Sequence, residues 1–396
     1  MPDETKKNIL VITRWFPDDA HPVRFVFVQR MIEALTAGSG KYSYSVISPT
    51  PYFPHCLSKL IPSLGLKCGG PEHGISPFGY QIFRPQYFKL PYPFLSELEW
   101  FSYSKTVLNL IAGKNLKFDL IHTHGLYPDA YVAVKIGHEL SIPVISHAHD
   151  SYIREHIFRK YEDKLGVVMK ESHFIAAVSG FQNKILAELY PDYGKKIFTV
   201  YNGVDTAKFT LPDGHEQVRL NPCRLIYVGN LIKTKQVDVL IHAIKLIPGA
   251  IDVTLDIYGT GPELSTYKQL VANLNLQKIV SFKGIIDNDQ LASILPAYSF
   301  LIQPSPYETF GIVLAEAMSC GVPVVCFKAS ATQEVVSSGT VGILAENNSA
   351  EGLAHAIITA AKREWNRMEI RNYAVKRFAI GKTVESIEKL YANALQ

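Results

Sequence analysis

Short apolar runs and amphipathic segments alternate along most of this chain. Apolar runs of strand length predict buried strands at residues 8–13, 118–125, 173–179, 224–229 and 253–258. Apolar residues at helical spacing predict helices at residues 24–37, 180–189, 312–318 and 382–395. The repeated order of strand, loop, helix and strand is typical of an α/β protein with a parallel sheet.

The clearest of these units lies between Ser305 and Val325. A Ser-Pro turn signal opens it, helical spacing covers Ile312–Met318, and Gly321 is placed to end the helix. The first N–H groups of a helix have no partner within it and carry the positive end of its dipole. The N–H groups of Phe310 and Gly311 therefore predict a site for a phosphate or a polyhydroxylated anion.

Two glutamates accompany this helix. Glu308 precedes it, and Glu316 lies two turns inside it. We predict that the two carboxylates serve different parts of one extended ligand. The alternative is an ordinary buried helix with one capping glutamate and one surface glutamate.

The composition restricts the class of protein. A chain of 396 residues is expected to form two domains, and 47% hydrophobic with 19% charged residues is typical of a globular protein. The net charge of +4 suits anionic small molecules or a membrane surface. It is too small to indicate a nucleic-acid partner.

The cysteines and the apolar runs indicate the compartment. Five cysteines without a C-x-x-C pair predict free thiols in a reducing cytoplasm. The N-terminal sequence has no signal-peptide core, and no apolar run approaches the length that spans a bilayer. We therefore expect a cytoplasmic protein whose membrane contact, where it occurs, is peripheral at the inner membrane face.

The stretch from residue 308 to residue 325 closely resembles the donor-site signature of the retaining GT-B glycosyltransferases of family 4 (glycosyl transferases group 1). The shared pattern is Glu-x-x-Gly, followed by Glu-Ala-Met-x-Cys-Gly-x-Pro-Val-Val. In that family the first glutamate contacts the transferred sugar, the following N–H groups hold sugar and phosphate, and the second glutamate holds the ribose. The resemblance assigns these roles to Glu308, to Thr309, Phe310, Gly311 and Ile312, and to Glu316.

The resemblance also covers the strand that ends at Gly229. The family follows this strand with an Arg and a Lys that grip the donor diphosphate. The Lys is retained as Lys235, whereas Asn230 stands in place of the Arg and Gln236 in place of a Gly. Lys235 is a point charge suited to phosphate. Asn230 lacks a full charge, so we expect that the diphosphate is bound more weakly or that Lys233 or another cation also contacts it.

Two further loops of the second half match the family. Gly259 and Gly261 match its Gly-x-Gly-Pro turn, which in the family faces the donor. The resemblance implies that the loop with Ile285 and Ile286 contacts the nucleobase through its backbone. The turn lacks the third glycine and the acidic residue of a dinucleotide fingerprint, which argues against NAD. Ser330-Ala331 replaces the family's usual Gly-Gly.

Histidines follow two predicted strands of the first half. The strand at 118–125 ends in two of them, and the strand at 143–146 leads into His147-Ala148-His149-Asp150. Side chains at the carboxyl ends of parallel strands face the crevice where such sheets bind ligands. The family places a histidine there near the sugar. A gapless alignment favours His149, and matching His-x-x-Asp favours His147; a core histidine bonded to backbone is the structural alternative.

Residues 49–104 are rich in Pro, Phe and Tyr. Aromatic and basic residues together suit an acceptor surface or a lipid interface. The alternative, which we favour, is an irregular insertion that packs its aromatic residues onto its own domain.

The resemblance implies an architecture of two Rossmann-like domains that face a cleft. We expect an acceptor domain at residues 1–209, a linker at 210–223, a nucleotide-sugar domain at 224–380 and a helix at 381–396 that returns to the first domain. No cofactor and no metal are expected beyond the nucleotide-diphosphate sugar itself.

The implied reaction is retaining, metal-independent transfer of a sugar to a hydroxyl acceptor, a glycan or a lipid-linked molecule. Glu308, Lys235 and one of His147 and His149 are the expected catalytic residues. Two alternatives stay open: a nucleotide-sugar epimerase of the same fold, and a catalytically weak partner subunit. The substitutions at Asn230, Gln236 and Ser330-Ala331 favour the second of these.

Overall fold

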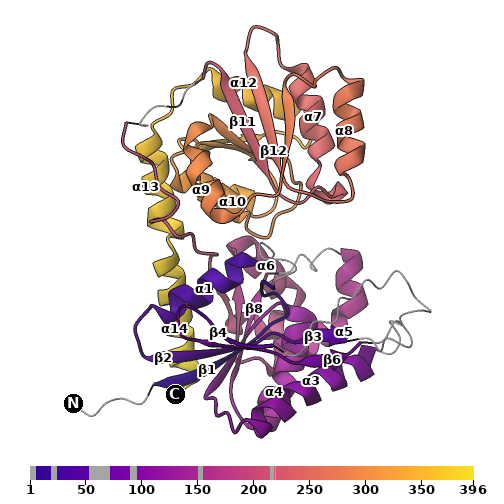
Figure 1. Ribbon diagram of the computed structural model, residues 1–396, viewed down its shortest axis with the longest axis vertical. Helices are drawn as coiled ribbons and strands as arrows, with labels where there is room; N and C mark the ends of the chain where they lie inside the picture. The colour runs from indigo at the N-terminus through magenta and orange to yellow at the C-terminus, as the bar shows by residue number, and fades with distance from the viewer. Residues whose placement is uncertain are drawn as a thin grey trace. The chain divides into compact units, whose positions relative to one another are not determined.

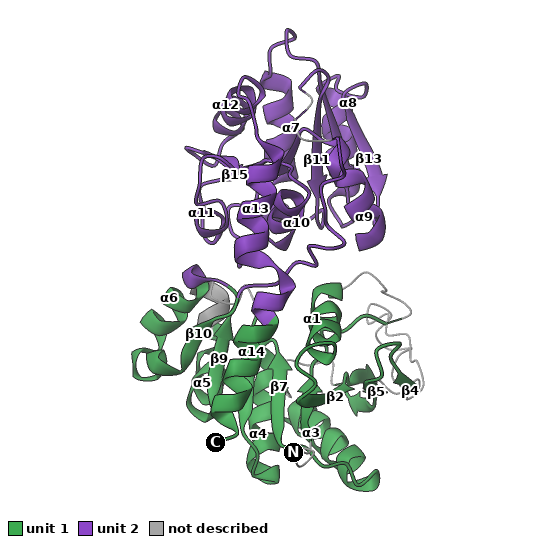
Figure 2. Cartoon of the chain, turned by 90° about the vertical axis from the view of Figure 1, so that its left-hand side faces the viewer, with its two compact units in different colours: residues 1–178, 182–200, 384–396 green, residues 179–181, 201–383 purple. Residues whose placement is uncertain are grey.

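The protein divides into two compact units in a computed structural model (Figure 2). The structure describes residues 6–18, 25–52, 72–89, 96–149, 155–214, 218 and 220–396. Unit 1 comprises residues 1–178, 182–200 and 384–396, and unit 2 comprises residues 179–181 and 201–383.

Unit 1 is built on an eight-stranded sheet of order β10-β9-β8-β7-β1-β2-β5-β4 (Figure 1). Neighbouring strands pair in parallel except β4 with β5. The strands are β1 Lys7–Ile12, β2 Tyr42–Ile47, β4 Glu72–Ile75, β5 Gln81–Arg84, β7 Leu120–His124, β8 Val144–Ala148, β9 Phe174–Ala177 and β10 Ile197–Thr199. A separate parallel pair joins β3 Thr50–Tyr52 and β6 Gln86–Phe88.

Helices of unit 1 cover both faces of this sheet, and the side chains of its central strands are buried on both sides. One core contains residues of α3, α4 and α5, and the other contains residues of α1 and α14. The helices are α1 Val26–Thr36, α3 Ser96–Gly113, η3 Leu126–Ala130, α4 Tyr131–Leu140, α5 Glu155–Glu171, α6 Gly180–Leu189, η4 Pro191–Lys196 and α14 Ile380–Ala394.

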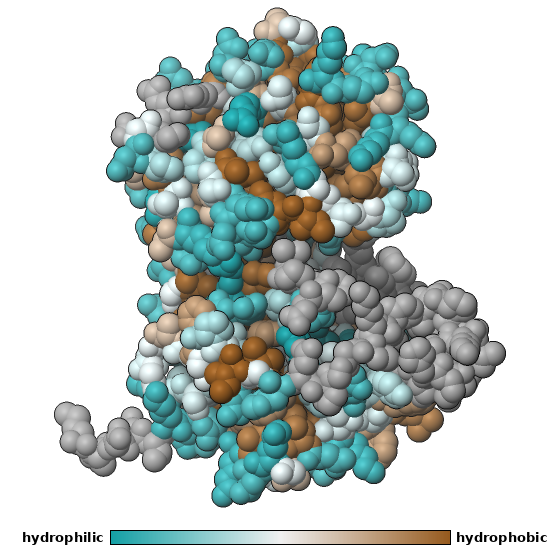
Figure 3. Space-filling view, in the orientation of Figure 1, coloured by the Kyte–Doolittle hydropathy of each residue, from teal (hydrophilic) through white to brown (hydrophobic). Residues whose placement is uncertain are grey.

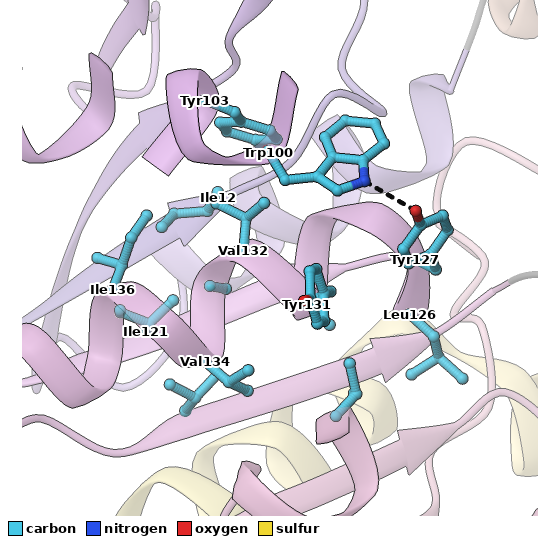
Figure 4. Close-up of a cluster of buried hydrophobic side chains, with 14 of the residues drawn as sticks. Ile12, Trp100, Tyr103, Ile121, Leu126, Tyr127, Tyr131, Val132, Val134 and Ile136 are labelled. Carbon is cyan, nitrogen blue, oxygen red and sulfur yellow. Dashed lines mark hydrogen bonds between the residues drawn. The ribbon is translucent and has the colours of Figure 1, made fainter. Parts of the chain in front are cut away.

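The first core is rich in aromatic residues (Figure 4). Trp100 and Tyr127 lie edge to face, and the indole N–H of Trp100 donates to the Tyr127 hydroxyl at 2.7 Å. Tyr87 stacks on Tyr103 with 5.0 Å between ring centroids. Each polar aromatic atom in the Trp100–Tyr127 pair thus keeps a partner inside an apolar layer, as burial requires.

Unit 2 has a six-stranded sheet of order β13-β12-β11-β14-β15-β16, and all its pairings are parallel. The strands are β11 Cys223–Val228, β12 Val253–Tyr258, β13 Val280–Gly284, β14 Phe300–Gln303, β15 Val324–Phe327 and β16 Gly342–Ala345. The helices are η5 Lys233–Lys235, α7 Val237–Leu246, α8 Leu264–Asn273, α9 Asn288–Ile294, η6 Leu295–Ala297, α10 Ile312–Ser319, α11 Thr332–Val335, α12 Ala350–Ala361 and α13 Arg367–Phe378.

The predicted fold class of two Rossmann-like α/β domains is confirmed. The last helix also returns to the first domain: α14 begins in unit 2, and its residues from Val384 onward belong to unit 1. There Val384, Ile387, Leu390 and Tyr391 enter the second core.

The unit boundaries differ from the predicted domain bounds. Unit 2 begins at Tyr201 rather than after residue 209, because the backbone at Val204 bonds to Phe378 and Ile380. The helix α13 was not predicted, since its charged sequence shows little apolar periodicity.

The aromatic segment 49–104 is only partly the irregular insertion that we predicted. It contributes strands β3 to β6 and the start of α3, and Tyr80, Phe83 and Tyr87 are buried in unit 1. Other apolar side chains of this segment are exposed: Ile75, Phe78, Leu98 and Phe101. Residues 53–71 and 90–95 of the segment lie outside the described residues.

Hydrophilic side chains cover much of the described surface in Figure 3, with apolar patches between them. Within the described ranges, each helix is too short or too polar to cross a bilayer. The described cysteines Cys223, Cys320 and Cys326 are buried free thiols, as expected. Burial raises the pKa of the Cys320 thiol to about 12.

The segment that opens unit 2 depends on Arg371 of α13. Its guanidinium donates to the carbonyl oxygens of Ser319 at 2.6 Å, Phe209 at 2.9 Å and Thr206 at 2.9 Å. We predict that Arg371→Ala lowers the free energy of unfolding of unit 2 by about 2–3 kcal/mol, because three carbonyl groups lose a charged donor. Urea denaturation measures this, and Lys376→Ala on the exposed face of α13 is the matched control. Equal stability of the two variants would contradict the prediction.

Candidate functional site

The sheet of unit 2 has a topological switch point between β11 and β14. Chain order runs from β11 to β13 toward one edge and from β14 to β16 toward the other. Loops that leave the carboxyl ends of β11 and β14 therefore diverge, and ligands bind in the opening between such loops. The residues predicted for donor binding follow the carboxyl ends of β11, β12, β13 and β14.

An ion pair joins the loops on either side of this switch point. Lys235, after β11, places its Nζ 2.5 Å from Oε1 of Glu308, after β14. The Gln303 side-chain amide donates to the same oxygen at 2.6 Å. The Glu308 side chain is 10% exposed and that of Lys235 is 24% exposed. A lysine and a glutamate that are 73 residues apart are thus held together at the rim of the sheet.

Ser330 holds the backbone of Glu308. Its Oγ accepts the N–H of Glu308 at 2.8 Å, and the carbonyl of Glu308 accepts the N–H of Ala331 at 3.3 Å. Ser330 has φ of 49°, a left-handed conformation that is costly for residues other than glycine. The family's Gly-Gly would avoid this cost but would lack the hydroxyl that accepts the Glu308 N–H.

The start of α10 is shaped by Gly311 and Phe310. Gly311, at the N-cap, has φ of 81°, which glycine adopts without a side-chain clash. The Phe310 ring is 1% exposed and lies 5.4 Å from the Phe378 ring, centroid to centroid. Because the ring is anchored in the core of unit 2, the backbone from Thr309 to Ile312 forms the turn at the helix start. This is the arrangement that suits an anion.

The Gly-x-Gly-Pro turn after β12 packs against the loop after β11. A Cβ atom at Gly259 would lie 1.9 Å from the Gly229 carbonyl oxygen, and one at Gly261 would lie 2.3 Å from the Leu231 carbonyl oxygen. The N–H of Leu231 donates to the Thr260 carbonyl at 2.9 Å. These two glycines are therefore required for backbone-to-backbone packing at the site.

Glu316 and Asn288 join the remaining side of the site. The Asn288 side-chain amide donates to Oε1 of Glu316 at 3.0 Å, which links α9 to α10. Glu316 is 8% exposed, whereas Ile285, in the loop before α9, is 60% exposed. Asn230 is also exposed, and its carbonyl accepts the Tyr227 hydroxyl at 3.1 Å.

Four histidines form a buried cluster in unit 1: His122, His124, His147 and His149. The parallel register pairs His124 of β7 with His147 of β8. Side chains two residues apart on a strand lie on the same face. Two His-x-His pairs on adjacent strands therefore place all four rings on one face, and adjacent ring centroids lie 4.3–5.5 Å apart.

Two hydrogen bonds orient these rings. Nδ1 of His124 lies 2.9 Å from Nε2 of His149, and Nδ1 of His122 lies 2.7 Å from the Tyr391 hydroxyl of α14. Burial lowers the pKa of His122, His124 and His149 well below 6.5 and lowers that of His147 to about 3. All four imidazoles are therefore neutral near pH 7.

Both histidines predicted for catalysis belong to this cluster. His147 is completely buried, whereas His149 is 7% exposed and lies beside Phe27 of α1, with 5.0 Å between ring centroids. Asp150, which one alignment pairs with His147, lies outside the described residues. His122 and His124 were not predicted as site residues, although two His-x-His pairs at neighbouring strand ends were the available signal. His122, His124 and His147 each offer a ring nitrogen within 4.8 Å of the others, a spacing at which a metal ion can be held.

Comparison with known proteins connects both units to sugar transfer. The family model "Glycosyl transferases group 1" matches residues 215–377, and "Glycosyltransferase Family 4" matches residues 26–208. The chain is 29% identical over 291 residues to N-acetyl-alpha-D-glucosaminyl L-malate synthase of Bacillus anthracis. That match covers 70% of this chain and 75% of the relative.

Solved structures share the fold. HepE of Anabaena in complex with UDP has a TM-score of 0.71 at 18% identity, covering 98% of this chain and all of that chain. Sucrose-phosphate synthase of Thermosynechococcus elongatus has a TM-score of 0.76 at 19% identity, covering 98% and 99% of the two chains.

The histidine cluster predicts a pH dependence of stability. The folded-state pKa values lie below the value near 6.5 of an unfolded histidine, so the unfolded chain binds more protons as pH falls. We predict that the free energy of unfolding of chelator-treated unit 1 is fully present above about pH 7. Below about pH 6 it falls by about 1.4 kcal/mol per pH unit for each histidine that stays neutral. Urea denaturation at a series of pH values measures the slope.

The matched variants are His147→Gln, in the cluster, and His138→Gln, at an exposed position of α4. The first should reduce the slope and the second should leave it unchanged. A stability that does not change between about pH 7 and pH 5 would contradict the assignment of neutral buried rings.

Ser330 provides a second prediction. Ser330→Ala retains the left-handed backbone and leaves the Glu308 N–H without its acceptor, so we expect a loss of about 1–2 kcal/mol in unfolding free energy. Ser330→Gly loses the same acceptor but relieves about 1 kcal/mol of backbone strain. In thermal or urea denaturation, the unfolding free energy should therefore be highest with serine at position 330, lower with glycine and lowest with alanine. Alanine equal to or better than glycine would show that the backbone strain is absent.

Proposed function

Because this chain belongs to the group 1 glycosyltransferases with the GT-B fold, we propose that it transfers a sugar from a nucleotide-diphosphate sugar to a hydroxyl acceptor. We propose that the anomeric configuration is retained and that the donor diphosphate is held without a metal ion. The observation that carries this proposal is the Lys235–Glu308 ion pair beside the start of α10, at the switch point of the unit 2 sheet.

Charge compensation at the diphosphate is assigned to Lys235 and the first turn of α10. The ammonium of Lys235 is only partly exposed and already lies at the rim of the sheet, so a phosphate can replace Glu308 as its partner. Backbone N–H groups from Thr309 to Ile312 add a fixed positive potential. As the sugar–phosphate bond breaks, the same groups stabilise the negative charge that develops on the leaving diphosphate.

The other donor groups are assigned around this charge. Glu308 contacts the sugar hydroxyls once Lys235 turns to the phosphate, and Gln303 keeps the carboxylate in place. Glu316, held by Asn288, bonds the ribose hydroxyls. The exposed Ile285 and the half-buried Ile286 lie after β13, and we assign their backbone to the nucleobase. The UDP in the HepE complex supports a nucleotide-sugar donor.

Sugar transfer in this proposal does not require a carboxylate nucleophile. The leaving phosphate departs on the face from which the acceptor attacks and accepts the acceptor proton. Glu308 is held by a lysine and an amide, which suits hydrogen bonding to a sugar better than attack on carbon. We assign the acceptor to unit 1. His149 is the histidine of the buried cluster assigned to this side of the reaction, because it alone of the four has surface exposure.

Exposed side chains of unit 1 support the acceptor class that we propose. Phe101 is 65% exposed, Leu98 is 58% exposed, and the Lys105 ammonium lies 5.9 Å from the centroid of the Phe101 ring. An apolar and basic surface of this kind suits a lipid-linked acceptor at a membrane face. A relative named as N-acetyl-alpha-D-glucosaminyl L-malate synthase supports a hydroxyl acceptor, and a glycan is the second acceptor class that we propose. Cytoplasmic location at the inner membrane face is part of this proposal.

Activity of Glu308 variants tests the proposal. We predict that Glu308→Gln lowers kcat for sugar transfer about 10²- to 10³-fold, because one positioned group of the transition state is lost. A panel of nucleotide sugars with simple hydroxyl acceptors, followed by mass spectrometry of products and free nucleotide, measures this. Glu351→Gln, on the exposed start of α12, is the matched control and should retain full activity.

Two alternatives give different outcomes in the same assay. A nucleotide-sugar epimerase would convert the donor with no acceptor present. A partner subunit would bind a donor, as the retained Lys235 allows, but would show no turnover that depends on Glu308. An inverted product would overturn retention while leaving the donor site unchallenged.

A further inference from the structure

The histidine cluster of unit 1 contains four imidazole rings, and the proposed sugar transfer uses only His149. His149 alone has surface exposure, and His122, His124 and His147 are completely buried. Rings of this kind ordinarily satisfy both nitrogens when they are buried. Each ring nitrogen of the cluster is therefore expected to have a hydrogen-bond or ligand partner.

Several ring nitrogens of the cluster are buried without a hydrogen bond to the described residues. Nε2 of His122 and Nε2 of His124 have none. Neither ring nitrogen of His147 forms a hydrogen bond of ordinary geometry with the described part of the chain, although the backbone of Val200 interacts with it. Each unsatisfied buried group costs about 1–3 kcal/mol. A stack of neutral rings would carry this cost at three neighbouring residues.

The hydrogen bonds that do exist leave the same atom available on two rings. His122 uses Nδ1 toward the Tyr391 hydroxyl, and His124 uses Nδ1 toward Nε2 of His149. In both contacts Nδ1 can be the donor, and the tautomer in which it donates has a lone pair on Nε2. Metal-binding histidines show this pattern, in which one ring nitrogen binds the ion and the other donates to a neighbouring group.

We propose that His122, His124 and His147 bind one divalent transition-metal ion of the Zn²⁺ type inside unit 1. Nε2 of His122, Nε2 of His124 and one ring nitrogen of His147 are the ligands. Tyr391 and His149 orient the two ligands that they contact. This site is separate from the donor site of unit 2 and does not rest on the proposed function.

The geometry and chemistry of the three rings fit such an ion. One nitrogen from each ring lies within 4.8 Å of the others, and tetrahedral zinc at its usual bond lengths requires about 3.4 Å between ligand nitrogens. Binding in the proposed site requires the three rings to move closer by this difference. The burial that keeps the imidazoles neutral also keeps them able to bind without first releasing a proton.

Three imidazoles select the class of ion. Nitrogen ligands suit Zn²⁺, Co²⁺, Ni²⁺ and Cu²⁺, whereas Mg²⁺ and Ca²⁺ prefer oxygen. A three-histidine set leaves a fourth position for a solvent-derived ligand. The exposed edge of His149 marks the side of the cluster that solvent reaches.

The experiment uses the full chain with no affinity tag, stripped with a chelator and then titrated with Co²⁺. We expect one Co²⁺ per chain by elemental analysis, with the visible absorption bands of tetrahedral cobalt, and displacement of the cobalt by Zn²⁺. Zn²⁺ at about 100 times its dissociation constant should raise the unfolding temperature of unit 1 by about 5 °C. Mg²⁺ at the same concentration should leave it unchanged.

Variants separate this site from adventitious binding. His124→Gln and His122→Gln should each weaken cobalt binding at least 10-fold and abolish the absorption bands, while His138→Gln binds as the parent does. Circular dichroism checks that each variant is folded. Binding of less than one Co²⁺ per chain by the unmodified chain, or binding without tetrahedral bands, would overturn the proposal. Loss of binding in His138→Gln would also overturn it, because the ion would then occupy a surface histidine.

Discussion

The parallel direction of neighbouring strands is the constraint on which both candidate sites depend. It brings the carboxyl ends of β11 to β14 to one edge in unit 2 and those of β7 and β8 to one edge in unit 1. Residues far apart in the chain meet there because each crossover returns through a helix. The Lys235–Glu308 pair and the register of His124 with His147 are two consequences of this one constraint.

Much of the fold was predictable because its signals are local. Apolar strands followed by amphipathic helices indicated two α/β domains, and the start of α10 was predicted from a turn, a glycine and a helical period. Helix α13 was missed because tertiary contacts, including those of Arg371, hold a charged helix in place. Strands β3 to β6 were missed for the same reason, since their short runs are defined by their pairing partners.

The sequence suggested which residues form the candidate donor site, but it did not indicate the contacts between them. Spacing in the chain and the family resemblance identified Glu308, Lys235 and Glu316, yet neither indicates that Lys235 bonds to Glu308 or that Asn288 bonds to Glu316. Ser330 shows why: its role depends on a left-handed backbone and on one hydroxyl oriented toward the Glu308 N–H. The histidine cluster likewise requires strand register, which sequence alone does not define when both faces of a sheet are buried.

The electrostatics of the two sites differ in kind. In unit 2, opposite charges lie together and Lys235 is partly exposed, so an incoming diphosphate can become the partner of Lys235 while the Gln303 amide stays bonded to the Glu308 carboxylate. In unit 1, burial keeps four imidazoles neutral, and a diphosphate placed there would meet no positive charge from them. An anion is therefore directed to the start of α10, whereas the neutral nitrogens of β7 and β8 suit a cation that accepts lone pairs.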